Sequence, residues 1–308
     1  MNLFELFVKI GADTTEANKG IDEVGQKTSG LGEKLKSGLA TAGKVAVAGV
    51  AAGTAALGTL GTKAVEAYAD YEQLVGGVET LFKDSQDQVM DYANNAYKTA
   101  GLSANEYMET VTSFSASLLQ SLDGDTSAAA DKANLAITDM SDNANKMGTD
   151  MTSIQNAYQG FAKSNYTMLD NLKLGYGGTQ AEMERLLADA EKISGIKYDI
   201  SSYADIVDAI HVVQTEMGIT GTTAEEAAST IQGSFGMMKS AWQNLVTGMA
   251  DPSQDLGVLV GNFTDSIVTV GNNLIPRIQD LLPRIVEATT SLVGTVSEQL
   301  PAIVGTVL

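Results

Sequence analysis

Residues 179–195 read TQAEMERLLADAEKISG and contain a full set of signals for one α-helix. Thr179 and Glu182 have the spacing of a capping box, in which a hydroxyl and a carboxylate satisfy backbone N–H groups at the start of a helix. Gly195 follows the last periodic apolar residue, where helices commonly end in a left-handed residue. The segment therefore predicts a short amphipathic helix with a defined start and end.

The same signals recur on both sides of this segment. Ser103 with Glu106, and Thr222 with Glu225, also fit the capping box. Glycines that follow the last apolar residue of a helical stretch are expected to end it. They are Gly101, Gly148, Gly195 and Gly218. The middle of the chain is therefore predicted to be a series of short, individually capped helices.

Composition favours the same fold class. The chain has only 4 Pro and 6% aromatic residues, so signals for β-sheet are few. Apolar residues recur at helical spacing, as in Val111, Phe114 and Leu118. We predict an all-α protein in which residues 63–250 form a central multi-helix domain. It is flanked by an extended N-terminal coiled-coil and apolar helix and by a long C-terminal amphipathic helix.

Charge and residue types exclude several classes of function. The 308 residues carry 19 basic and 38 acidic side chains, a net charge of -19. Residues 1–63 have a balance of +1, which leaves -20 for the remainder. Such a chain would repel a phosphate backbone, which argues against a sequence-specific nucleic-acid reader. The absence of Cys removes disulfides and thiolate metal sites, and a single His cannot build a zinc site within the chain.

The N-terminal segment, residues 1–37, allows two interpretations. Residues 6–12 alternate with period two, so a short strand and a helix are equally expected there. From Ala17 to Leu35 the apolar residues recur in steps of four and three, the pattern of a coiled-coil seam. Because the seam covers only about two and a half heptads, an amphipathic helix packed within the chain is the alternative.

Residues 38–62 form an Ala/Gly-rich stretch that carries almost no charge. Val45–Thr62 reaches the minimum length of a membrane-spanning helix. However, Ala, Gly and Thr insert weakly compared with Leu or Phe, so we favour a helix buried among copies of itself or inside a tube over a constitutive membrane span. The candidate membrane or packing residues are Gly49, Ala51, Gly53, Ala55 and Leu57.

Residues 251–308 again show apolar residues in three-and-four steps, from Val260 to Val307, which predicts the start of a long amphipathic helical region. Pro276, Pro283 and Pro301 fall near one line along that helix and would bend it in one sense. Leu308 follows without a cap or a breaker, so we expect the helical region to belong to a longer protein.

No pattern of residues predicts catalysis, so we expect no catalytic, cofactor-binding or metal-binding residue. Gly38–Lys44 has the glycine and lysine spacing of a phosphate-binding loop, but Val45 replaces the magnesium-binding hydroxyl. His211 lies one helical turn after Asp208, yet no serine sits on a nucleophile elbow. It is interpreted as a structural or surface histidine. Residues 123–125 lack the further oxygen ligands of a calcium loop and predict a helix–helix turn.

Residues 174–178 form a Gly-rich turn with one aromatic side chain. Glycines permit tight turns that other residues cannot adopt. We interpret Gly175, Tyr176, Gly177 and Gly178 as a tight connection and as a candidate docking surface.

Several stretches together resemble the tape measure proteins of phages and prophages of Gram-positive bacteria, and the resemblance covers essentially the whole chain. They are ELFVKIGAD (5–13), AYADYE (67–72), MLDNLKLGYGGT (168–179), EMERLL (182–187), DAIHVVQ (208–214) and GITGT (218–222). The third to sixth of these are the specific ones. The Ala/Gly-rich stretch alone would not distinguish the family.

The resemblance implies a non-enzymatic protein that lies in several copies inside the tail tube. Its length would set the length of the tail, and it would leave the tail ahead of the DNA. The implied partners are further copies of the chain, the tail tube protein, tail assembly chaperones, baseplate or tail tip proteins, and the host membrane at ejection. The implied locations are the lumen of the virion's tail tube and, during assembly, the bacterial cytoplasm. Tape measure proteins are commonly much longer than 308 residues. The alternative function is a membrane-active helical pore-forming or lysis protein.

Overall fold

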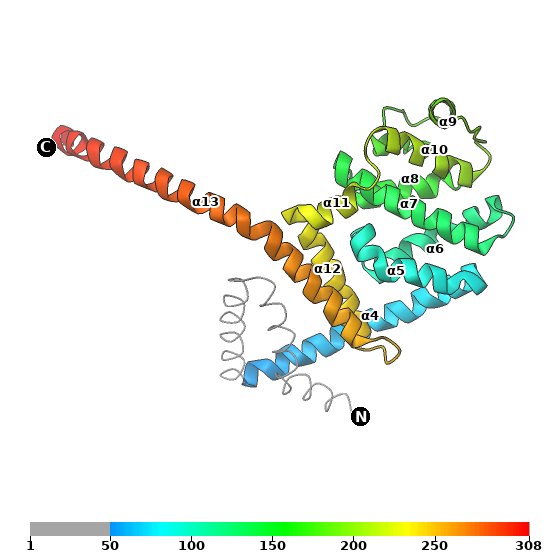
Figure 1. Cartoon of the computed structure of the whole chain (residues 1–308), viewed down its shortest axis with the longest axis horizontal. Helices are drawn as coiled ribbons and strands as arrows, with labels where there is room; N and C mark the ends of the chain where they lie inside the picture. Colours follow the sequence, from blue (N-terminus) through cyan, green and yellow to red (C-terminus); the bar gives the residue numbers. More distant parts are fainter. Residues whose placement is uncertain (1–49, 308) are drawn as a thin grey trace. The chain divides into compact units, whose positions relative to one another are not determined.

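The computed structural model describes residues 50–307, with side chains from Thr62 to Leu281 and at Pro283 and Arg284. Within that range every regular element is a helix and there is no strand (Figure 1). The all-α prediction is confirmed for these residues. The strand and coiled coil expected within residues 1–37 lie outside the described residues, as do residues 38–49.

The chain divides between Lys63 and Ala64 into two compact units, and the division falls inside the first described helix. Residues 64–307 belong to the second unit, which contains the hydrophobic core. The helices are α4 (Val50–Phe82), α5 (Gln86–Thr99), α6 (Ala104–Ser121), α7 (Thr126–Met147), α8 (Met151–Phe161), α9 (Gln180–Ser194), α10 (Tyr203–Glu216), α11 (Thr222–Ser229), α12 (Ile231–Gly248) and α13 (Leu256–Val307), with 3-10 turns at Lys83–Ser85 and Leu169–Leu172.

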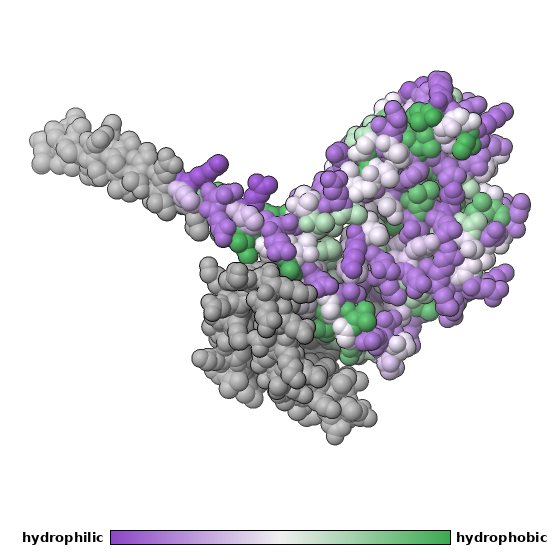
Figure 2. Space-filling view, viewed as in Figure 1, coloured by the Kyte–Doolittle hydropathy of each residue, from purple (hydrophilic) through white to green (hydrophobic). Residues whose placement is uncertain are grey.

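One core joins the end of α4 to helices α5–α10. The predicted apolar stripe of α6 is buried in it, with Val111 and Leu118 inaccessible to solvent and Phe114 3% exposed. Tyr107, Tyr158 and Phe161 are among its largest buried side chains. On the face of the domain shown in Figure 2, hydrophilic residues predominate and apolar residues occur in small groups. Removing the apolar stripes from water is therefore the main favourable term in this fold.

The predicted helix ends are confirmed. All four glycines expected to end helices have a positive φ, between 64° and 72°. The capping box at the start of α6 is complete, because Ser103 accepts a hydrogen bond from the backbone N–H of Glu106 and the carboxylate of Glu106 accepts one from the N–H of Ser103. Residues 123–125 form the predicted turn between α6 and α7, and Asp125 caps α7.

The capping box predicted at Thr222 is wrong. The N-cap of α11 is Gly221, and the hydroxyl of Thr222 donates to the carbonyl of Ile219 at 2.7 Å. The carboxylate that accepts from the helix start belongs instead to Asp142 of α7. It lies 2.6 Å from the N–H nitrogen of Gly221 and 2.8 Å from that of Thr223. A buried carboxylate from another helix has replaced the local partner, because it satisfies two N–H groups at once.

Helix α12 is fastened to the corner between α5 and α6. Ser240 donates to the carbonyl of Gly101 at 2.8 Å, and the side-chain oxygen of Asn244 accepts from the N–H of Ala104, at the start of α6, at 2.8 Å. These bonds satisfy backbone groups that a helix end leaves without partners. The corner and α12 are thus positioned by the same two polar side chains.

The first part of α13 packs along α12. The rings of Trp242 and Phe263 lie 5.2 Å apart, and Asn273 donates to the carbonyls of Ala228 and Thr230, just before α12 begins. This part of residues 251–308 therefore packs against α11 and α12. Pro276 and the later prolines lie within the helical range of α13.

The cap of α11 gives a first testable prediction. Changing Asp142 to Ala removes the acceptor of two backbone N–H groups, so the free energy of unfolding should fall by about 2 kcal/mol. Changing the exposed Glu225 to Ala should alter it by less than about 0.5 kcal/mol. Urea unfolding followed by circular dichroism measures both. A larger loss of stability for the Glu225 variant than for the Asp142 variant would support the local capping box instead.

Candidate functional site

The Gly-rich turn of residues 174–178 is tied to the first turns of α9. The guanidinium of Arg185 lies 4.2 Å from the centre of the Tyr176 ring and donates to the carbonyl of Gly175 at 2.7 Å. The hydroxyl of Tyr176 donates to Asp189 at 3.1 Å. Cation–π contact and hydrogen bonds therefore hold the aromatic side chain, which is half-buried, against the helix that follows.

Glu182 also serves this turn rather than a complete capping box. Thr179 accepts from the N–H of Glu182 as predicted, at 3.2 Å. The carboxylate of Glu182, however, accepts from the N–H of Gly177 at 3.0 Å and from Arg185. These two donors, Arg185 first, lower the pKa of Glu182. The predicted box is half formed, and its second half fastens the turn.

Close approach of the backbone explains the last glycine of the turn. A Cβ atom at Gly178 would lie 2.2 Å from the carbonyl oxygen of Thr167, whereas one at Gly177 would lie at an ordinary 3.5 Å from the Glu182 side chain. Gly175 has a φ of +87°, a conformation that other residues rarely adopt. The structure thus brings all four candidate docking residues together. A close backbone approach explains Gly178 and a positive φ explains Gly175.

The candidate membrane or packing residues are only partly within the described range. Gly49 lies outside it, whereas Ala51, Gly53, Ala55 and Leu57 lie in the helical range of α4. Across the helices that the structure describes, none combines the length and apolar character needed to cross a membrane. The prediction for residues 45–62 begins before that range, so it stays a prediction.

A contact between a histidine and a buried carboxylate is the feature that sequence reasoning missed. Nδ1 of His211 lies 2.9 and 3.0 Å from the two carboxylate oxygens of Asp139, whose side chain is inaccessible to solvent. Asp208, the acid one turn before His211, pairs instead with Lys132 of α7. His211 is therefore bonded to a carboxylate of another helix, and this partner is 72 residues away in the sequence. An acidic residue in a helix is usually read as solvated, so the sequence gives no signal for this contact.

Three further polar side chains on α7 are buried with Asp139. Asn143 donates to the carbonyl of Leu172 at 2.9 Å, and Asp142 receives the start of α11. Burial raises the pKa of Asp139 to about 6, against the opposing effect of His211. The hydrogen bond to Asp139 raises the pKa of His211. The buried polar residues of this helix are Asp139, Ser141, Asp142 and Asn143.

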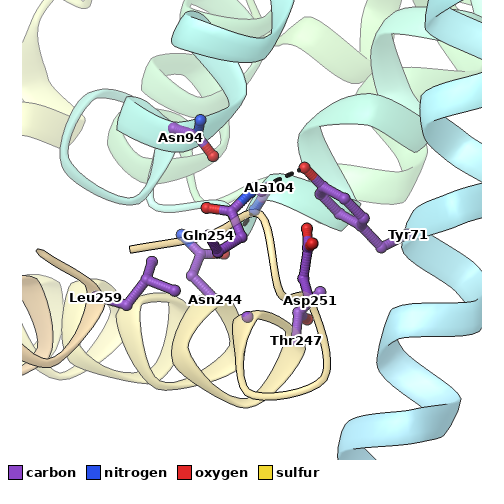
Figure 3. A pocket seen from close by; sticks show the side chains of 9 residues that line it. Tyr71, Asn94, Ala104, Asn244, Thr247, Asp251, Gln254 and Leu259 are labelled. Carbon is purple, nitrogen blue, oxygen red and sulfur yellow. Dashed lines mark hydrogen bonds between the residues drawn. The ribbon is translucent and has the colours of Figure 1, made fainter. Parts of the chain in front are cut away.

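A small polar cavity lies between α4, α12 and the loop that joins α12 to α13 (Figure 3). Gln254 donates to the hydroxyl of Tyr71 at 3.1 Å, and Asp251 and Asn244 line the same space. Burial, and then the charge of Asp251, raise the pKa of Tyr71. The cavity measures about 20 Å³, room for about one water molecule. The hydrogen bond between Gln254 and Tyr71 fastens the loop to α4, and the cavity is too small for a larger ligand.

In comparisons with known proteins, no family model, curated protein or solved structure matches the chain. Among the described residues, no group of three or more His, Cys, Asp and Glu side chains is arranged to hold a metal ion. A groove between α9 and the segment that follows it is lined by polar and apolar residues, among them Leu187, Tyr198 and Ile200.

Gly178 gives the second prediction. Changing Gly178 to Ala forces a Cβ against the Thr167 carbonyl, so the free energy of unfolding should fall by about 1–3 kcal/mol. Changing Gly177 to Ala is the matched control and should cost less than about 1 kcal/mol. Thermal unfolding of the two variants, side by side, makes the comparison. Equal losses would mean that the close approach at Gly178 does not constrain the turn.

Proposed function

We propose that the chain is a tape measure protein of a phage or prophage of a Gram-positive bacterium, acting without enzymatic activity as a scaffold inside the tail tube. The observation that carries the proposal is the sequence string from Met168 through Thr222, which resembles that family. The helical character of residues 50–307 is compatible with it. In this proposal the length of the chain sets the length of the tail, and the protein leaves ahead of the DNA.

The exposure of the C-terminal seam supports self-association as part of this function. Val270 is 7% exposed against the domain, but Ile278 and Leu281, farther along the same helix, are 43% and 54% exposed. An amphipathic helix gains stability by burying its apolar seam. Further copies of the chain, packed along α13, are the proposed cover. The tail tube protein, the tail assembly chaperones and the tail tip proteins are the other proposed partners.

The ruler role predicts a change in tail length. Removing residues 286–299 in frame takes out two heptads of the C-terminal helix, so tails should shorten by about 21 Å at ~1.5 Å per residue. Replacing the same residues with a different heptad sequence of equal length should leave tails at parental length. Electron microscopy of assembled tails measures both.

A deletion of similar size inside the domain distinguishes ruler from scaffold. Removing Thr179–Ile193 takes away α9, whose Met183 and Leu186 are inaccessible to solvent. This exposes the core, so tail assembly should fail rather than give shorter tails. If the deletion of residues 286–299 leaves tails at parental length, that segment does not act as a ruler.

A membrane role at ejection is the second candidate, and the stretch of residues 38–61, whose only charged residue is Lys44, favours it. Ala51→Asp or Ala55→Asp would place a charge near the centre of that stretch, at about 3 kcal/mol on an insertion scale if it spans lipid. Tails should assemble and DNA delivery should fail, with Ala51→Ser as the uncharged control. DNA delivery is measured by potassium efflux. If it proceeds at the parental rate in the Asp variants, packing is the segment's only role. Liposome leakage by the purified chain alone would favour the pore-forming alternative.

A further inference from the structure

The contact between Asp139 and His211 joins α7 to α10 and has only one titratable cation. His211 is the only histidine in the chain. Its side chain is 30% exposed, whereas that of Asp139 is completely enclosed. Both oxygens of the carboxylate lie within hydrogen-bond distance of the same ring nitrogen, Nδ1. The imidazole can therefore exchange protons with water, whereas the carboxylate has no contact with water.

The other charged groups around the pair already have partners. Lys132 of α7 is bonded to Asp208 of α10, and Asp142 of α7 holds the N–H groups that start α11. Tyr158 of α8 is also near the pair, and burial, followed by the charge of Asp139, raises the pKa of Tyr158. From α6 and α9, which also pack on α10, no described charged side chain bonds to the pair. Within the described residues, the charge of Asp139 is thus compensated by His211.

We propose that Asp139 and His211 form a proton-operated clasp between α7 and α10, closed while the imidazole is protonated and loosened when the imidazole loses that proton. With that proton on His211, and with Asp139 ionised, the contact is an ion pair. Without it, a negative charge stays buried beside a neutral ring, and Asp142 and Asp208 add repulsion. A buried charge that loses its partner is strongly destabilising.

The direction of the pH dependence follows from both groups. Burial raises the pKa of Asp139 from 3.8 to about 6, and the bond to Asp139 raises the pKa of His211 above 6.5. Each group keeps its proton to a higher pH in the folded chain than in the unfolded chain. The folded chain therefore binds more protons, and its stability falls as pH rises. The Asp139 contribution is complete below 3.8 and is lost by about pH 6, and the His211 contribution is lost as pH rises through its raised pKa.

The clasp acts first on α10 and α11. Asp142 follows Asp139 by about one turn of α7 and caps α11, which α10 reaches through the short connection of residues 217–221. Helices α5 and α6 are held by other contacts, including the bonds from Ser240 and Asn244. A rise in pH should therefore open α10 and α11 locally before the whole domain unfolds.

The full chain allows a direct test, because its single histidine gives a single set of imidazole signals in the NMR spectrum. A pH titration should give His211 a pKa above 6.5 in the parental chain and an ordinary value in Asp139→Asn. Hydrogen exchange of α10 and α11 amides, corrected for intrinsic rates, should speed up between pH 6 and pH 8, by up to about tenfold per pH unit for each proton released. Exchange in α5 and α6 should change less.

Lys132→Gln is the matched control, since it breaks the other ion pair between the same two helices. This variant should keep the pH dependence, whereas Asp139→Asn should lose it. A parental His211 pKa of 6.5 or below, or exchange of α10 and α11 that does not respond to pH, overturns the clasp. Those two measurements need no variant, so the test stands even if Asp139→Asn does not fold.

Discussion

The buried polar face of α7 is the constraint on which its neighbours depend. Asp139, Asp142 and Asn143 lie in the domain interior, where each must find a partner or be strongly unfavourable. Their partners are His211 of α10, the first N–H groups of α11 and the carbonyl of Leu172. Apolar burial alone would allow these elements to slide, whereas directional bonds from one rigid helix fix their positions.

How far the sequence predicts this fold depends on how local each interaction is. Ser103 and the terminal glycines could be predicted because the groups they satisfy lie within a few residues. The box at Thr222 failed because Asp142, some 80 residues earlier, offers a better acceptor. The pair of His211 with Asp139 was missed for the same reason, because the two residues are 72 positions apart in the sequence. Pattern alone cannot tell a buried acid from a solvated one, so buried polar contacts between helices escape prediction.

The candidate docking turn shows a similar division. Its glycines indicated a tight connection, and the structure has one, with Gly178 against the Thr167 backbone. What the pattern could not predict is that Arg185 and Glu182 of the next helix hold the turn closed. The docking role of the turn stays a prediction.

The proposed ruler and the proposed clasp place different demands on one chain. A ruler requires the long helix to be joined firmly to its domain. The Trp242–Phe263 contact supplies that join through α12, and the Asn273 bonds add to it at Ala228 of α11 and at Thr230 before α12. Helix α12 is in turn fastened to α5 and α6 rather than to α10. Loosening of the clasp would thus open the α10–α11 side of the domain and weaken the bond from Asn273 to Ala228 of α11, while the Trp242–Phe263 contact between α12 and α13 persists. The local stability of the domain can then vary with pH without altering the length that the helix measures.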